Sequence, residues 1–221
     1  MAMLADDYVV IGWLEAIAAA HACLLFPDIY THHHHMLTMS LARGIGAKLN
    51  RSPDVVTVLE VAARIHDIGK GAVIVELHEN RFKILDSNSA ELIKIRTHAE
   101  LGERFILTMA ARIGFPHLLI PIATAIRSHH EWYGGGSYPD GKRGNAIPWM
   151  ARVIAVLDSL AAMTDPGRPH RPALSLTAAR EEIKRCSGTQ FDPTIVTALE
   201  SILTDPPPAV AIILETLIES G

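Results

Sequence analysis

The pattern of apolar and polar positions predicts helices along most of the chain. From Ser52 to Ile65, apolar residues recur at spacings of three and four, as in a helix that buries one face. Ser52-Pro53 is typical of a helix start, with an N-cap residue followed by proline at the first helical position. Comparable patterns predict further helices at about residues 6–26, 31–49, 89–113, 116–128, 148–165, 175–186, 192–203 and 209–219.

Two segments interrupt the helical pattern. Residues 131–145 contain five glycines around Tyr138-Pro139, a composition typical of a loop, and residues 166–172 form a second break. Val73–Leu77 is the one short strand candidate. No unit of 20 to 50 residues repeats. The sequence therefore predicts an all-α fold, a single helical bundle at residues 29–221 preceded by an N-terminal helical appendage at residues 1–28.

Composition narrows the function classes. The chain has 221 residues, of which 49% are hydrophobic, enough to bury a sizeable core. No apolar run reaches the roughly 18 residues of a membrane span, and Asp6 and Asp7 stand where a secretory signal would be basic, so we expect a cytoplasmic protein. A net charge of −4 disfavours binding to a nucleic acid polymer. The two cysteines lie far apart in the sequence, so we expect no disulfide.

The 12 histidines carry the main chemical signal. His66-Asp67 is followed at a regular interval by His98, then by His129-His130, and finally by Asp158. Mixed sets of imidazoles and carboxylates hold Fe, Mn or Zn, and two such cations can clamp the attacking and leaving oxygens of a phosphoryl transfer. Because adjacent helical residues point about 100° apart, the His66-Asp67 pair suits a helix end. The alternative is a set of unrelated histidines, which the ordered spacing disfavours. Outside this series and the run at residues 32–35, we expect the other histidines, His21, His78, His117 and His170, to be surface or packing residues.

The order of these motifs resembles the HD-GYP family of bacterial cyclic di-GMP phosphodiesterases. The resemblance rests on His66-Asp67-Ile68-Gly69-Lys70, on the segment 95–102 around His98, on His129-His130-Glu131 and on the stretch from Ser137-Tyr138-Pro139 to Asp158. It continues through residues 168–172 and 188–193, and covers about residues 30–204. It implies an HD-superfamily bundle around a dinuclear metal site, in which a metal-activated water hydrolyses cyclic di-GMP to linear pGpG, with further cleavage to GMP left open.

The resemblance also implies which residues bind metal. Asp67 would be shared by two divalent cations, with iron favoured and manganese or zinc as alternatives. His34 is selected from the run of four histidines at 32–35 by the family's usual spacing, although that run also fits a tag remnant or a polar patch. One cation would be held by His34, His66, Asp67 and Asp158, and the other by Asp67, His98, His129 and His130.

Catalytic and substrate-binding roles follow from the same resemblance. Lys70, with Asp67, would act in catalysis by meeting the phosphate charge or helping the leaving group, unless it is only a cation at a helix C-terminus. Tyr138, with Ser137 beside it, would stack on a guanine base. Arg168 and Arg171 would fork onto phosphate oxygens or guanine edges. The alternative is a plain turn aromatic and two solvated arginines.

Three positions depart from the family pattern. Ser137 replaces the glycine of the name motif, and we expect this to cost a backbone conformation of positive φ. Ala161 replaces a second aspartate, and Tyr30 stands where three-metal members have a glutamate, which favours two metals. These departures leave two alternatives, a degenerate HD-GYP signalling module that binds protein or nucleotide, and an HD hydrolase for another nucleotide. Beyond the cyclic dinucleotide, the partners to consider are a sensor or receiver domain, a signalling protein and another copy of the chain.

Overall fold

The structure, a computed structural model, describes residues 3–25, 29–77, 90–165, 172–208, 210–212 and 214. Within these residues the fold is all-α and contains no strand, which confirms the predicted fold class. The helices are α1 (Ala5–Leu25), α2 (Ile29–Lys48), α3 (Pro53–Ile65), α4 (Lys70–Leu77), α5 (Ala90–Arg96), α6 (His98–Ile113), α7 (Pro116–Ser128), α8 (Trp149–Thr164), α9 (Leu176–Arg185) and α10 (Pro193–Thr204), with a single 3-10 turn, η1 (Gly144–Ala146).

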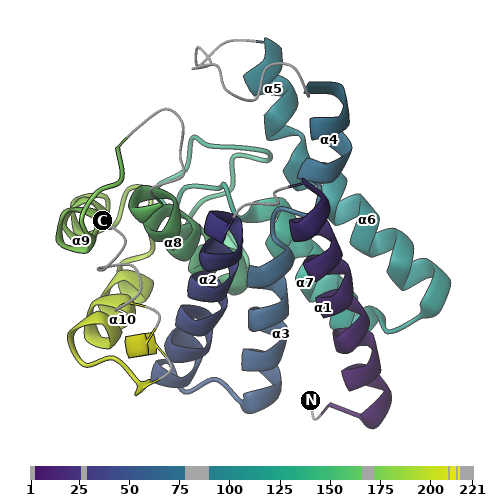
Figure 1. Cartoon of the computed structure of the whole chain (residues 1–221), viewed down its shortest axis with the longest axis horizontal. Coiled ribbons are helices and arrows are strands. Elements are labelled where there is room, and N and C mark those ends of the chain that lie inside the picture. Colours follow the sequence, from purple (N-terminus) through teal and green to yellow (C-terminus); the bar gives the residue numbers. More distant parts are fainter. Residues whose placement is uncertain are drawn as a thin grey trace.

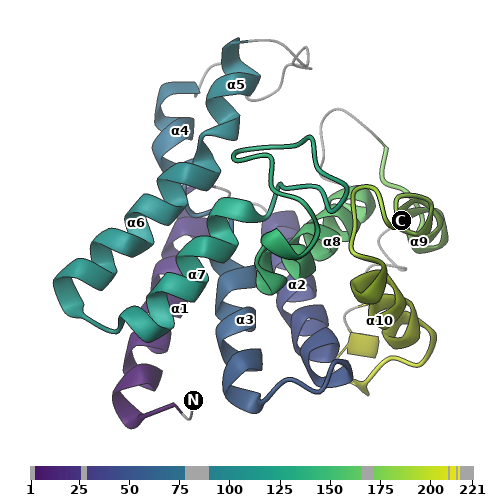
Figure 2. The ribbon, with the colours of Figure 1, turned by 180° about the vertical axis from the view of Figure 1, so that it is seen from behind.

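The helices pack as a bundle with α2 and α3 near its middle (Figure 1). Helix α2 packs against α3, α8 and α10, and α3 packs against α7, which in turn pairs closely with α6. Helices α4 and α5 lie together and project from one end of the bundle, as both ribbon views show (Figure 2). Among the described residues, no helix is both long and apolar enough to cross a bilayer.

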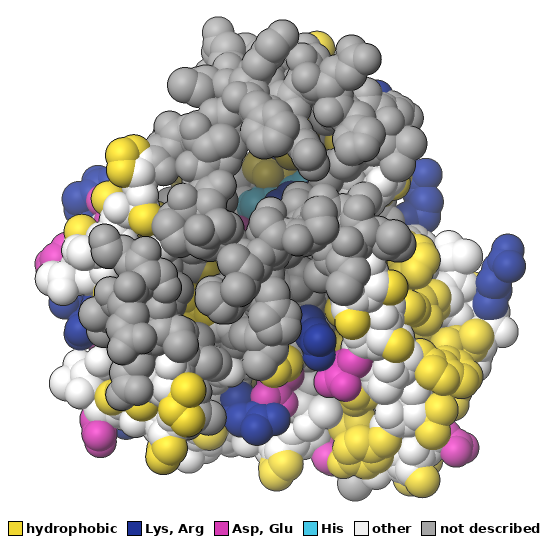
Figure 3. Space-filling model, viewed as in Figure 1, with side chains coloured by type: hydrophobic (Ala, Val, Ile, Leu, Met, Phe, Trp, Pro, Cys, Tyr) yellow, Lys and Arg dark blue, Asp and Glu magenta, His cyan; other side chains and the backbone are white. Residues whose placement is uncertain are grey.

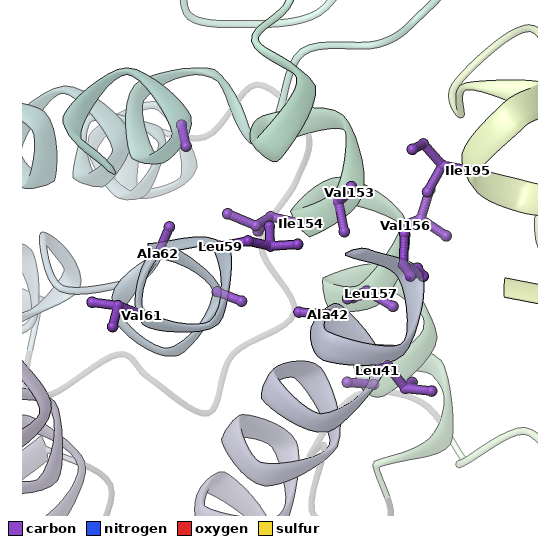
Figure 4. Close-up of a cluster of buried hydrophobic side chains, with 14 of the residues drawn as sticks. Leu41, Ala42, Leu59, Val61, Ala62, Val153, Ile154, Val156, Leu157 and Ile195 are labelled. Atoms are coloured by element: carbon purple, nitrogen blue, oxygen red, sulfur yellow. The ribbon is translucent and has the colours of Figure 1, made fainter. Parts of the chain in front are cut away.

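One core holds these helices together. Leu41 and Ala42 of α2 meet Leu59 of α3 and Ile154 and Leu157 of α8 (Figure 4). Each of these five side chains is fully buried. This packing places the C-terminal ends of α3 and α7 and the middle of α8 in the same region of the molecule, where the predicted site residues lie.

Helix α1 adds to this core. Its buried residues Val10, Ile11, Leu14 and Ala18 belong to the same hydrophobic cluster as those of α2 and α3. In addition, Asp7 lies 2.8 Å from His117 Nε2 of α7 and is itself almost fully buried. The division of the chain at residue 28 stays a prediction.

Two helix starts agree with the sequence prediction, and two predicted elements do not. Helices α3 and α10 begin at Pro53 and Pro193, as predicted, and the Asp192 side chain accepts a hydrogen bond from Thr194 N. The strand candidate Val73–Leu77 was wrong, because this segment is part of α4, and a short apolar run does not distinguish a strand from a buried helix. The predicted helix at 89–113 is broken at Thr97, whose hydroxyl donates to Lys94 O.

Leu59 offers a test of the core. Replacing this fully buried side chain by alanine leaves a cavity between α2, α3 and α8, and Leu59→Ala should lower the free energy of unfolding by about 2–5 kcal/mol. The control is Val55→Ala on the same helix, where the side chain is 38% exposed and the change should be small. Urea denaturation followed by circular dichroism measures both. Equal effects of the two substitutions would contradict this packing.

Candidate metal centre

Most of the predicted ligands come from the ends of separate helices. His66 and Asp67 lie in the turn that directly follows α3, and His98 is the first residue of α6. His129 and His130 directly follow α7, while Asp158 lies within α8. The structure brings these six side chains together, although they are spread over 93 positions of the chain. The prediction that the His-Asp pair sits at a helix end is confirmed.

Three of the histidines are oriented by hydrogen bonds to backbone carbonyls. Nδ1 lies 2.7 Å from Ala63 O in His66, 2.7 Å from Ile95 O in His98 and 2.6 Å from Ile126 O in His129. Because a carbonyl oxygen only accepts, each Nδ1 must carry the proton and donate. In the neutral ring this leaves the lone pair on Nε2, the tautomer found in metal-binding histidines whose other nitrogen is hydrogen-bonded.

The Nε2 atoms converge. His98 Nε2 lies 3.4 Å from His129 Nε2 and 3.1 Å from His130 Nε2. Nε2 of His98 and Nε2 of His129 are both acceptors in the neutral rings, so their lone pairs repel at this distance unless positive charge lies between them. Nitrogen ligands about 2.0–2.1 Å from one cation are themselves roughly 3.0–3.4 Å apart. The donor set therefore fits a bound cation.

Asp67 lies between two sets of histidines. Its Oδ1 is 3.3 Å from His98 Nε2 and 4.0 Å from His129 Nε2. Its Oδ2 is 3.3 Å from His66 Nε2, and His66 Nε2 in turn is 3.6 Å from Asp158 Oδ1. The potential ligand atoms form two groups. The first comes from His98, His129 and His130, and the second from His66, Asp67 and His129. One carboxylate thus faces both groups, which is the arrangement of a bridging ligand, and the role of each residue as a ligand stays a prediction.

The electrostatics of the cluster also suit cations. Burial and the neighbouring histidines lower the pKa of His130 to about 3 and that of His129 well below its usual value, so both rings are neutral. Burial raises the pKa of Asp67, but Lys70 and His66 outweigh it and hold the carboxyl ionised. Burial lowers the pKa of His66, but Asp67 and Asp158 outweigh it and raise the value to about 10. Neutral imidazoles and ionised carboxylates are the forms that bind metal, so His129, His130 and Asp67 are ready to bind, whereas His66 carries a proton that a bound cation would displace.

Lys70 lies beside the cluster. Its ammonium donates to Asp67 Oδ2 at 2.5 Å. Lys70 opens α4, because α3 ends at Ile65 and a turn separates the two helices. The alternative of a cation at a helix C-terminus was therefore wrong.

The glycine-rich loop brings an aromatic ring over the cluster. The ring of Tyr138 stacks on that of His130, with centroids 4.9 Å apart and an angle of 28°, and the Arg96 guanidinium lies 5.2 Å from the Tyr138 ring centroid. The Ser137 hydroxyl donates to His130 O at 2.6 Å. The expected backbone cost of Ser137 was wrong, because Gly135 and Gly136 take the positive φ values, 90° and 85°, and Ser137 does not.

Three predicted site residues are not placed by the structure. His34 lies in α2, but its side chain is outside the described part of the chain, and Arg168 and Arg171 are outside the described residues.

Conversely, sequence reasoning missed Arg96 and the role of Glu131, which is buried and accepts a hydrogen bond from Asp140 N. Only the positions of these two residues next to His98 and His130 could have drawn attention to them. On the face drawn in Figure 3, histidine side chains are visible at one central place.

The bundle and its cluster define a class, an all-α protein whose buried histidines and half-buried aspartates can hold divalent metal. Comparison with known proteins gives the family. The model of the HD domain matches residues 14–195, so the chain belongs to the HD domain family.

Two curated relatives agree with this placement. The chain is 33% identical over 162 residues to the cyclic di-GMP phosphodiesterase response regulator RpfG of Xanthomonas campestris pv. campestris, covering 73% of this chain and 40% of the relative. It is 31% identical over 183 residues to a cyclic di-GMP phosphodiesterase of Thermotoga maritima, covering 81% of this chain and 47% of the relative. The chain thus spans less than half the length of either relative.

A solved structure shows the same fold. Bd1817, an HDG"Y"P protein from Bdellovibrio bacteriovorus, superposes with a TM-score of 0.60 at 18% identity, over 88% of this chain and 60% of that one. The resemblance to HD-GYP proteins noted in the sequence is confirmed.

Gly69 offers a test of how the cluster is assembled. A Cβ atom at this position would overlap the carbonyl oxygen of His98 and lie 2.6 Å from Gly102 N, so no side chain fits between the turn and α6. Gly69→Ala should push Asp67 away from His98 and weaken metal binding by about 10- to 100-fold. Elemental analysis and competition with a chelating dye measure this. The control is Gly12→Ala, where nothing lies within 4 Å of the added atom; unchanged metal affinity in the Gly69 variant would refute the assembly described.

Proposed function

We propose that this chain is a metal-dependent phosphodiesterase that hydrolyses cyclic di-GMP to linear pGpG. The observation that carries the proposal is the convergence of buried imidazoles, held with Nε2 pointing inward, around both oxygens of Asp67. The names of the two relatives as cyclic di-GMP phosphodiesterases support the choice of substrate. Further cleavage to GMP is compatible with the same chemistry.

The cofactor is proposed to be a pair of divalent cations. The first would be held by His66, Asp67 and Asp158, with His34 as a further ligand, and the second by Asp67, His98, His129 and His130. His129 belongs to both close groups of ligand atoms, so it lies at the boundary between the two. Imidazole and carboxylate ligands accept iron, manganese and zinc, and the resemblance to the HD-GYP family is the reason to favour iron. When bound, such cations activate water as a nucleophile and neutralise charge on the phosphoryl group.

The protein's own groups would complete the site. Lys70 brings a cation to within hydrogen-bonding distance of Asp67, where it would also meet a phosphate oxygen or the leaving oxygen. Tyr138 would present its ring to a guanine base, and Arg96, exposed beside that ring, would face the anionic substrate. Arg168 and Arg171 would add contacts to phosphate or to guanine edges.

Asp67 is the first test of this proposal. Asp67→Asn keeps the size of the side chain but removes the charge that faces both histidine groups, so cyclic di-GMP hydrolysis should fall by about 10³-fold and bound metal should fall with it. The exposed Asp6→Asn serves as a control and should behave as the unaltered protein. Product analysis by chromatography and elemental analysis of protein purified without added metal provide the two readouts. A metal-loaded protein that binds cyclic di-GMP but leaves every cyclic dinucleotide intact would refute the proposal and favour a signalling module.

Tyr138 tests the substrate. Tyr138→Ala should raise KM for cyclic di-GMP about tenfold, because stacking of a base on an aromatic ring contributes about 1–3 kcal/mol. Tyr138→Phe retains the stacking ring and should keep a KM close to the original. The small ester bis(p-nitrophenyl) phosphate has no nucleobase, so its turnover should be equal in all three proteins. If both substrates lose turnover alike in Tyr138→Ala, the ring has no role in base recognition.

A further inference from the structure

The loop that carries Tyr138 is tied to α7 by an ion pair. Arg127, near the end of α7, donates from Nε to Asp140 Oδ2 at 2.9 Å and from Nη2 to Asp140 Oδ1 at 2.6 Å. The third nitrogen of the same guanidinium, Nη1, donates to Glu103 Oε2 of α6 at 2.7 Å. The Arg127 and Asp140 side chains are only 25% and 29% exposed, and forked contacts of this kind are among the stronger ion pairs.

Other contacts fix Asp140 from its remaining sides. Lys142 donates to Asp140 Oδ2 at 2.8 Å and to the buried hydroxyl of Ser128 at 3.0 Å. The backbone N–H of Asp140 donates to Oε1 of the buried Glu131 at 2.7 Å. Arg127, followed by Lys142, holds the pKa of Asp140 well below its usual value, so the carboxylate stays ionised. Asp140 is therefore the point at which the loop is attached to the helix that supplies His129 and His130.

The start of the loop is attached to a different part of the fold. Tyr133 N donates to Gln190 O at 3.0 Å, and Gly134 N donates to Thr189 O at 2.6 Å. A Cβ atom at Gly134 would lie 2.9 Å from Thr189 O, so glycine is required for this close approach. The loop thus spans two fixed points, Gly134 against the 186–191 turn and Asp140 against α7.

Tyr138 lies between these two points. Its ring stacks on His130, and the Arg96 guanidinium lies over it, but among the described residues neither of them forms a hydrogen bond with Tyr138. Ser137 adds one hydrogen bond to His130 O. Stacking alone leaves a tyrosine ring free to shift along the loop, whereas a bidentate ion pair two residues away limits where its backbone can lie.

We propose that Arg127 and Asp140 are positioning residues that hold Tyr138 in place for the nucleobase of the cyclic dinucleotide. The inference rests on the proposed function for the identity of the ligand, but the attachment of the loop is a property of the fold alone. The ion pair acts through the backbone of residues 138–140 and touches neither substrate nor metal. Its removal therefore raises KM for a substrate that bears a base and leaves the chemistry at the cluster unchanged.

Two substitutions test the attachment, each removing one partner. Arg127→Met retains the aliphatic length of the side chain without its charge, and Asp140→Asn retains the shape of the carboxylate without its charge. Arg104→Met, on the exposed face of α6, is the matched control for loss of an arginine. The first readout is hydrogen exchange of the peptide covering residues 132–147, measured by mass spectrometry. We expect exchange to be about fivefold faster in both variants than in the unaltered protein and in Arg104→Met, since an ion pair of this kind contributes roughly 1 kcal/mol.

The second readout separates recognition from chemistry. In both variants KM for cyclic di-GMP should rise about fivefold to tenfold, with kcat and turnover of bis(p-nitrophenyl) phosphate unchanged. Unchanged exchange in the loop overturns the attachment. Faster exchange with an unaltered KM, or an equal loss on both substrates, overturns the positioning role. If the unaltered protein cleaves the small ester but no cyclic dinucleotide, the proposed function fails, and binding of cyclic di-GMP by calorimetry then decides the positioning role, which requires weaker binding in both variants.

Discussion

The site depends on one repeated interaction, the hydrogen bond from histidine Nδ1 to a carbonyl oxygen three residues earlier. His66, His98 and His129 each make it, and each lies at or just beyond the C-terminal end of a helix. Carbonyl groups in the last turn of a helix have no N–H partner within that helix. The histidine therefore satisfies an otherwise unpaired carbonyl, and in return its ring is fixed with Nε2 directed at the centre of the cluster.

This arrangement explains why the fold and the chemistry are coupled. The packing of α3, α7 and α8 around Leu59, Ile126 and Leu157 determines where the helix ends meet. Glycine at position 69 allows the turn after α3 to contact the start of α6, and so brings Asp67 next to His98. The Nε2 atoms of His98 and His129 face each other as acceptors, which is unfavourable unless a cation lies between them, so the cluster gives up stability for affinity toward cations.

The loop after His130 shows how a departure from a family motif can be accommodated. Ser137 stands where HD-GYP proteins have glycine, yet the neighbouring Gly135 and Gly136 supply the left-handed backbone conformations, and the serine hydroxyl is bonded to His130 O. The loop is held by the contacts of Asp140 and Gly134, and Ser137 adds one hydrogen bond to them. Substitution within the motif therefore leaves Tyr138 stacked over the cluster.

Local patterns along the chain were enough to predict the all-α class, the starts of α3 and α10 at prolines, and the six residues that meet in the cluster, because helix periodicity, capping and ligand chemistry are local properties. The sequence misleadingly predicted a strand at Val73–Leu77 and one unbroken helix at residues 89–113. A short apolar run fits either a strand or a helix, and a single threonine does not show that a helix breaks there. Three features become visible once the chain is folded: which oxygen of Asp67 faces which histidine, that Arg96 lies over Tyr138, and that Arg127 holds the loop through Asp140. These contacts join residues from different helices and loops, and their geometry follows from how the helices pack, which spacing along the chain does not encode.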